Sequence, residues 1–299
     1  MNILIAGGER TYDTGLTDVE ILSINSNETC GPVKDLPTGK FGASAAWHLE
    51  RPTICGGYYS EECYRYLVDN DYWEPYGALP HHQDHAASVS WPNGDWWIAG
   101  GSAFVALYYY ETYINITQEG IRVPVPTEQH CIARINETHA IMTGGVRHIA
   151  TGLDETTKYH KQAYIIDWTT KSWSETTSMA SHHAGHACFV FGDYAYVIGG
   201  WSQDDDVVPT EKYNLVTREW TVGPPLPGSK RLEFAATVEY DETYLLIGGR
   251  EVETDEESDA VFQFDEKLQD WVERTERLQL ARCAHSAIPF PDGTVDCSK

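Results

Sequence analysis

Histidine and carboxylate side chains recur in clusters along this sequence, and they are the groups best suited to chemistry. His81, His82 and Asp84 form one cluster, and His182 and His183 form a second. Imidazole and carboxylate groups gathered in this way can bind Zn²⁺ or Cu²⁺. Four further histidines follow a regular pattern: His85, His130, His186 and His285. Two interpretations stay open, a metal site or a structural role in which the imidazoles hydrogen-bond to the backbone.

The elements that must position these side chains form an internal repeat. A Gly-Gly pair preceded by an apolar run occurs six times, and such runs are typical of buried strands. The pairs begin at Gly7, Gly56, Gly100, Gly144, Gly199 and Gly248. Their spacing of 44 to 55 residues is enough for four ordinary strands with turns.

Aromatic residues recur in phase with the glycines. Tyr66 precedes Trp73 by seven residues, and Tyr213 precedes Trp220 by the same spacing. With the turn residues between them, these pairs indicate a strand, a tight turn and a return strand. Each repeat therefore predicts four strands, which we letter A to D, with the Gly-Gly pair at the end of strand B.

This combination of Gly-Gly pairs and spaced aromatics resembles the kelch motif over nearly the whole chain. The resemblance implies an all-β, six-bladed β-propeller with four-stranded antiparallel blades. Residues 1–299 are expected to form one domain. Because the chain begins in a B strand, we expect residues 284–290 to supply the missing A strand. Blade 1 would then be shared between residues 1–37 and 281–290, which removes an open seam.

Strand alternation sorts the loops onto two faces, because D-to-A links and B-to-C loops must share one side. Kelch propellers generally bind partner peptides there, so the resemblance implies a protein-interaction module. The predicted contact residues on this face are Lys40, His81, His82, Asp84, Glu128, His182, His183, Arg231 and Arg282. With acidic loops around them, they favour a protein or peptide partner of basic or mixed charge.

The charge balance excludes some classes of partner. A formal net charge of −24 repels nucleic acid and anionic membrane surfaces. No apolar run is long enough for a membrane span, and the first residues lack a signal-peptide pattern. The lack of a signal-peptide pattern favours the cytoplasm, but the compartment stays open, with the extracellular space as the alternative from three sequons. We expect a monomer.

Catalytic motifs such as a nucleophile elbow or a phosphate loop are absent from the sequence. We therefore expect no enzymatic activity and no cofactor. Two alternatives stay open. One is a metal-dependent enzyme of the propeller channel, and the other is a secreted glycoprotein recognition domain.

Sequons and cysteines favour the second alternative. Asn27, Asn115 and Asn136 each begin an Asn-x-Thr sequon, and all three are expected on the face opposite the binding face. Among seven cysteines, disulfides Cys55–Cys63 and Cys30–Cys297 are two open hypotheses. Cys131 and Cys188 are expected to be buried and free.

Overall fold

The computed structural model describes residues 1–10, 15–24, 30–101, 106–110, 117–125, 127–151, 154–202, 210–229, 232–265, 267–295 and 297. Strands dominate this part of the chain, which confirms the all-β prediction. Its helical elements are two single turns of 3₁₀-helix, η1 (Val68–Asn70) and η2 (Pro227–Ser229). Neither is long or apolar enough to span a membrane.

Six antiparallel sheets follow one another along the chain, and we number them in that order. Sheet 1 contains β28 (Ser286–Pro289), β1 (Asn2–Ala6) and β2 (Val19–Ser23). Sheet 2 contains β3 (Ala43–His48), β4 (Arg51–Gly56), β5 (Glu62–Leu67) and β6 (Tyr72–Ala78). Sheet 3 contains β7 (Ala87–Ser90), β8 (Trp96–Ala99), β9 (Ala106–Tyr110) and β10 (Thr117–Arg122).

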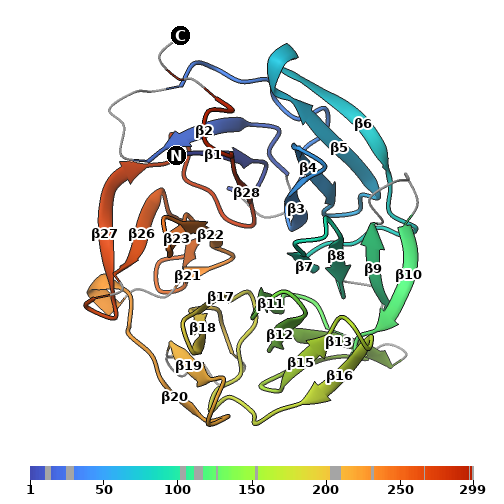
Figure 1. The fold of residues 1–299 in the computed structure, drawn as a ribbon, viewed down its shortest axis with the longest axis vertical. Coiled ribbons are helices and arrows are strands. Elements are labelled where there is room, and N and C mark those ends of the chain that lie inside the picture. Colours follow the sequence, from blue (N-terminus) through green and yellow to red (C-terminus); the bar gives the residue numbers. More distant parts are fainter. Residues whose placement is uncertain are drawn as a thin grey trace.

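The remaining sheets have four strands each. Sheet 4 contains β11 (Cys131–Arg134), β12 (His139–Thr143), β15 (Ala163–Asp167) and β16 (Ser172–Glu175). Sheet 5 contains β17 (Ala187–Phe191), β18 (Tyr194–Ile198), β19 (Glu211–Asn214) and β20 (Trp220–Val222). Sheet 6 contains β22 (Ala236–Tyr240), β23 (Thr243–Ile247), β26 (Ala260–Asp265) and β27 (Asp270–Arg277). Figure 1 shows the sheets arranged around a central axis, with the first strand of each repeat innermost.

Sheet 1 combines the two ends of the chain. β28 lies antiparallel beside β1, with Leu4 opposite Ile288 and Ile5 opposite Ala287. The four strands expected for every repeat are found in sheets 2 to 6, whereas sheet 1 has three strands among the described residues.

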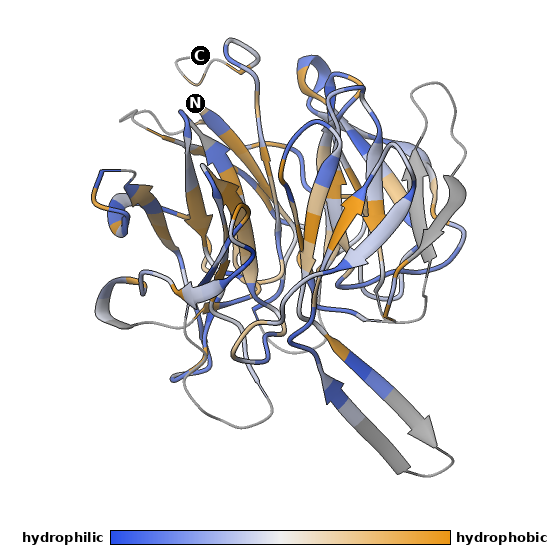
Figure 2. Ribbon diagram, turned by 60° about the horizontal axis from the view of Figure 1, so that its bottom comes forward, coloured by the Kyte–Doolittle hydropathy of each residue, from blue (hydrophilic) through white to orange (hydrophobic). Residues whose placement is uncertain are grey.

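Two small additions extend from the loops. β13 (Val146–Thr151) and β14 (Asp154–Tyr159) form a hairpin after sheet 4's Gly-Gly pair. β21 (Leu232–Glu233), β24 (Arg250–Glu251) and β25 (Glu256–Glu257) form a three-stranded ribbon. The β13–β14 hairpin projects from the face opposite the two chain ends (Figure 2). It accounts for the longest step between glycine pairs.

The apolar core is divided among the contacts between neighbouring sheets. Sheets 1 and 2 bury Leu4, Ile54 and Trp73 against one another, and sheets 6 and 1 bury Ile247 and Ile3 in the same way. A comparable apolar cluster lies between the two sheets of each of the other four neighbouring pairs. Because each sheet buries both faces, the second strand of each sheet is mainly apolar, as in β1, β8 and β18 (Figure 2).

The Gly-Gly pairs lie where neighbouring sheets approach most closely. The second glycine of each pair donates its N–H to a carbonyl of the next sheet, as Gly145 does to His183 at 2.7 Å. Gly249 makes the equivalent bond from sheet 6 to Arg282 at 2.9 Å. A Cβ on Gly144 would lie 2.3 Å from the His183 carbonyl oxygen, so a side chain is excluded.

A ring of six backbone hydrogen bonds surrounds the axis. One residue just before the innermost strand of each sheet donates to the equivalent residue of the preceding sheet, over 2.7 to 2.9 Å. The six ring residues are Gly42, His85, Gln129, Gly185, Phe234 and Ala284. All six have a positive φ, between 50° and 63°. The sixth bond, from Gly42 to Ala284, joins sheet 2 to sheet 1 and completes the circle.

Three disulfides are present, and one sequence expectation was wrong. Cys55 pairs with Cys63, which lies opposite it on the neighbouring strand, and Cys30 pairs with Cys297. Cys131 and Cys188 were expected to be free, but they are joined to each other between β11 and β17. Their strands are innermost in adjacent sheets, so the two side chains meet despite their separation in sequence. Cys283 is a free, buried thiol, and burial raises its pKa.

Candidate functional site

The narrow end of the central channel is the candidate site, and we call it the mouth. It is formed by the residues that directly precede the hydrogen-bonded ring, together with those that follow each Gly-Gly pair. Glu128 and Val146 pair through two backbone hydrogen bonds, which places the mouth beside the β13–β14 hairpin. It therefore lies on the face of the B-to-C loops.

Carboxylates from several sheets gather at the mouth around His85. The Asp84 carboxylate lies 3.5 Å from His85 Nδ1, and Glu128 lies 3.1 Å from His148 Nε2 in β13. Burial raises the pKa of Glu128 and of Glu233, and His85 lies within electrostatic range of both. A carboxylate that burial has deprived of part of its hydration is stabilised by a nearby cation.

One buried arginine partly balances these acids. Arg250 donates to Glu9 at 2.9 Å, and Glu233 lies 3.5 Å from its guanidinium. Asp255 and Glu257 both lie 3.8 Å away. Among the residues that the structure describes, four carboxylates thus lie within 4 Å of the Arg250 guanidinium, so acidic groups outnumber it on this side of the mouth.

Aromatic rings close the axis and continue to the surface. His85 and Phe234 come from sheets three positions apart, yet their ring centroids are 5.0 Å apart, so they meet across the channel. Phe41 contacts His85 and stacks on Tyr58, with centroids 5.9 and 4.7 Å apart. Tyr59 contacts Tyr58 and is 74% exposed. Aromatic faces next to carboxylates are well suited to hold a cation.

Five of the predicted contact residues are buried: Asp84 and Glu128 are each 8% exposed, and three others are buried almost completely. Lys40, His183 and Arg282 occupy equivalent repeat positions, two residues before the ring, and each is at most 2% exposed. Each side chain donates to the carbonyl of the first glycine of its own sheet's pair: Lys40 to Gly56, His183 to Gly199, and Arg282 to Gly7. Burial lowers the pKa of Lys40 to about 8. These residues support the fold and do not form part of an accessible surface.

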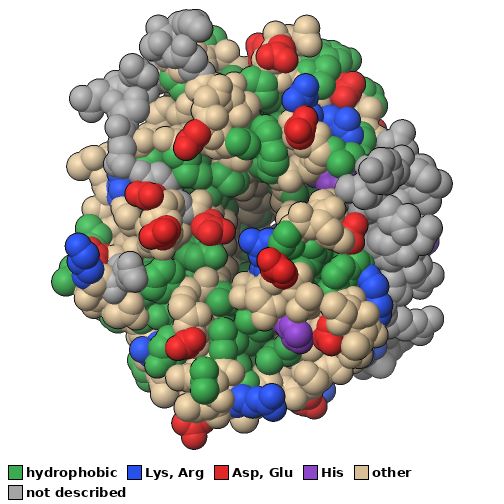
Figure 3. All heavy atoms as spheres, in the orientation of Figure 1, with side chains coloured by type: hydrophobic (Ala, Val, Ile, Leu, Met, Phe, Trp, Pro, Cys, Tyr) green, Lys and Arg blue, Asp and Glu red, His purple; other side chains and the backbone are tan. Residues whose placement is uncertain are grey.

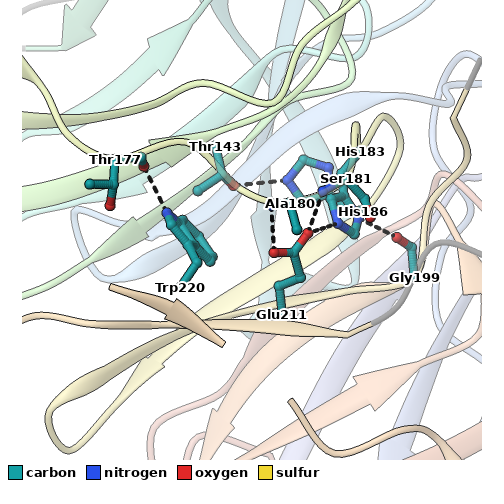
Figure 4. A network of polar contacts seen from close by, with 9 residues as sticks. All are labelled: Thr143, Thr177, Ala180, Ser181, His183, His186, Gly199, Glu211 and Trp220. Atoms are coloured by element: carbon teal, nitrogen blue, oxygen red, sulfur yellow. Dashed lines mark hydrogen bonds and ion pairs between the residues drawn. The ribbon is translucent and has the colours of Figure 1, made fainter. Parts of the chain in front are cut away.

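A glutamate completes this arrangement, as Figure 4 shows for His183. Glu211 lies 3.1 Å from His183 Nε2 and accepts the N–H groups of Ala180 and Ser181 at 2.8 and 2.9 Å. These hydrogen bonds outweigh the effect of burial and lower the pKa of Glu211. Glu20 takes the equivalent place beside Arg282, with its Oε1 3.0 Å from a guanidinium nitrogen.

The other predicted contact residues have varied positions. Asp84 and Glu128 lie in the mouth, and His81 is exposed. His82 lies beside Tyr59, with their ring centroids 5.9 Å apart. His182 is half-buried and lies near His160, whose pKa is lowered first by burial and to a lesser extent by nearby cationic groups, including His182. Arg231 lies outside the described residues, as do Asn27 and Asn115.

The regularly spaced histidines pack against glycines of neighbouring sheets. A Cβ on Gly100 would lie 2.5 Å from His130, and a Cβ on Gly248 would lie 2.7 Å from His285. Burial lowers the pKa of each of these two imidazoles to about 3. Both line a small cavity of about 140 Å³ at the ring, large enough for water. Within the described residues, no group of three metal-binding side chains converges.

The opposite end of the channel is wider. Its hollow has a volume of about 760 Å³ and is lined from all six sheets, for example by Trp47, Arg134 and Glu239. Figure 3 shows this hollow at the centre of the face that carries the chain ends.

Several mouth residues were missed by sequence reasoning, namely Glu9, Phe41, Tyr58, Glu233, Phe234 and Arg250. A signal for two of them was present in the sequence. Phe41 and Glu233 occupy the same position in their repeats as Asp84 and Glu128 do in theirs, directly before a residue of the hydrogen-bonded ring. Comparing the repeats residue by residue would have identified these two. Glu9 and Arg250 could not be found in this way. Each directly follows a Gly-Gly pair, and the residue type at that position differs from repeat to repeat.

Comparisons with known proteins point to one family. A family model described as the Kelch motif matches residues 182–227. Kelch-like protein terF of Aspergillus terreus is 30% identical over 147 residues, which cover 47% of this chain and 30% of that protein. Alpha-scruin of Limulus polyphemus is 28% identical over 116 residues, 38% of this chain and 12% of the relative. Kelch-like protein 15 of Danio rerio is 28% identical over 106 residues, which cover 36% of this chain and 17% of that protein. The matches thus span less than a third of each relative.

Proposed function

We propose that this chain is a kelch-repeat protein-interaction module that binds a basic segment of a partner at the mouth. The observation that carries this proposal is the gathering of Glu9, Asp84, Glu128 and Glu233 at the mouth, where the described residues include the buried guanidinium of Arg250. The proposal is a binding module rather than an enzyme, acting as a monomer. The acidic charge disfavours nucleic acid and anionic membranes as partners.

The proposal rests on a single-domain, six-bladed propeller that is closed between sheets 6 and 1. Two observations support closure: the pairing of β28 with β1, and hydrogen bonds from sheet 6 to sheet 1 equivalent to those between other neighbours. A closed ring fixes the loops of all six sheets relative to one another. The mouth acids then face an incoming side chain from several directions.

The chemistry of the mouth selects the partner. A lysine or arginine side chain would add positive charge beside Glu128 and Glu233, whose present cationic neighbours are His148 and Arg250. Its apolar stem would contact Phe41 and Tyr58. An acidic segment would be repelled by these carboxylates. Tyr58 and Tyr59 extend the contact outward, because Tyr59 is exposed beside the mouth.

The test uses a random octapeptide library displayed on phage and selected on the immobilised full chain. We expect selected peptides to be enriched in lysine and arginine. The double variant Glu128→Gln/Glu233→Gln should weaken their binding about tenfold or more, since two charge-assisted contacts are lost.

A matched control removes two carboxylates from the other face. Asp241 and Glu242 are exposed in the turn between β22 and β23, so Asp241→Asn/Glu242→Gln changes the net charge equally. The control should bind as the unaltered chain does. Selection of acidic peptides, or an equal loss of binding in the control, would refute the proposal.

A further inference from the structure

Six of the seven cysteines are paired, and an exposed sequon stands close to one of the pairs. We propose that this chain matures in an oxidising compartment, where its three disulfides form and Asn136 is N-glycosylated. This inference goes beyond the proposed function and does not rest on it.

The disulfides join places that the fold alone brings together. Cys131–Cys188 links the innermost strands of sheets 4 and 5, across 57 residues of sequence. Cys30–Cys297 ties the segment after β2 to the segment after β28, across 267 residues. Cys55 and Cys63 face each other across β4 and β5. Structural disulfides of this number persist in oxidising compartments and are rare where glutathione keeps thiols reduced.

The remaining thiol agrees with this interpretation. Cys283 is fully buried, and burial raises its pKa, so little reactive thiolate is available to exchange with the three disulfides. The pairing pattern is therefore protected from rearrangement once the chain has folded.

The sequon at Asn136 has the geometry of an accessible acceptor. Asn136 is exposed in the turn between β11 and β12. Its Oδ1 accepts the N–H of Thr138 at 2.9 Å and the Thr138 hydroxyl at 3.2 Å. This arrangement leaves Nδ2, the atom that carries a glycan, without a hydrogen bond to any residue that the structure describes.

The position of the sequon leaves the mouth unobstructed. Asn136 is one of the residues that line the wide hollow, on the face opposite the mouth. A glycan attached there would extend over the wide end of the channel. Cys131 starts the strand that leads to this turn, so disulfide and glycan would stabilise neighbouring parts of sheet 4.

Both modifications have defined reactants. For each disulfide, two thiols lose two protons and two electrons, which reduce the disulfide of a thiol oxidoreductase to a dithiol. For the glycan, Nδ2 forms a bond to the anomeric carbon of a lipid-linked oligosaccharide and loses one proton. The bond from that carbon to the lipid pyrophosphate breaks, and the pyrophosphate leaves.

The first test uses the full-length protein purified from its natural source. It is denatured without reductant, alkylated and analysed by mass spectrometry. We expect one alkylated cysteine, Cys283, and seven after reduction. Peptide N-glycosidase in ¹⁸O-labelled water should convert Asn136 to labelled aspartate. Seven alkylated cysteines without reductant, or an Asn136 peptide found wholly unmodified, would overturn the proposal.

A second test assigns the glycan with matched variants of the same residue. Thr138→Ala destroys the sequon, whereas Thr138→Ser keeps it. After secretion from eukaryotic cells, the alanine variant should lose the mass of one glycan and the serine variant should not. Equal masses for the alanine variant and the unaltered chain would show that Asn136 is not an acceptor.

Discussion

Replacing Arg282 with alanine tests whether this residue supports the fold or contacts a partner. Its guanidinium is 1% exposed and donates to Gly7 and Asp18 carbonyls at 2.8 and 3.0 Å, and to Glu20 at 3.0 Å. Removing it leaves the buried Glu20 carboxylate without its counter-charge. Breaking a buried pair in this way costs about 3–5 kcal/mol. That is a large part of the roughly 5–15 kcal/mol of a typical domain.

The matched control is Arg277→Ala, which removes the same charge from the surface. Arg277 is 37% exposed and pairs with Glu273 at 2.7 Å. Exposed pairs of this kind contribute about 0–1 kcal/mol. The free energies of unfolding are measured by urea denaturation, with the slope of each transition compared between variants.

A double variant, Arg282→Met/Glu20→Gln, separates the buried charge from other effects. It should recover part of the lost stability, because no unpaired carboxylate remains. A loss below about 1 kcal/mol for Arg282→Ala, similar to that of the control, would refute the structural role. Weaker partner binding with unchanged stability would refute it as well.

Two further predictions concern acid and the chain end. Since burial lowers the pKa values of His130 and His285 to about 3, the unfolded chain binds protons below pH 6.5 that the folded chain does not. The free energy of unfolding should therefore fall as pH drops from 6.5 toward 3, by up to about 1.4 kcal/mol per pH unit for each histidine. His130→Gln should reduce this slope, and urea midpoints that stay constant from pH 7 to 5 would contradict the reasoning. A chain that ends at Cys283 lacks β28 and exposes the edge of β1, so it should lose cooperative thermal unfolding in near-ultraviolet circular dichroism. A chain that ends at Cys297 is its control, and equal transitions in both would argue against closure.

The repeated strands could be predicted because their signals are local and steric. A side chain on Gly144 would collide with the next sheet, so glycine marks that place in the sequence itself. The apolar run before each pair indicates a strand buried on both faces. These features recur six times, so irregular spacing in one repeat does not hide the pattern.

The site residues were harder to predict because residue type does not reveal burial. Lys40 and Arg282 are charged, and charge normally indicates a surface residue. Here both side chains turn inward to glycine carbonyls. Arg282 also pairs with Glu20 in β2, and Lys40 also donates to the backbone carbonyl of Glu62 in β5. The partner of Cys131 depends on which sheets are neighbours in the ring, which the spacing of the cysteines does not specify.

The ring of six hydrogen bonds also bears on the thermodynamics of recognition. Each ring residue donates to one neighbour and accepts from the other, so no single repeat can shift without breaking two bonds. The backbone beneath the mouth is therefore preorganised before any partner arrives. A binding partner would lose its own conformational entropy but would need to order little of this chain. We expect affinity at the mouth to depend mainly on the flexibility of the partner segment.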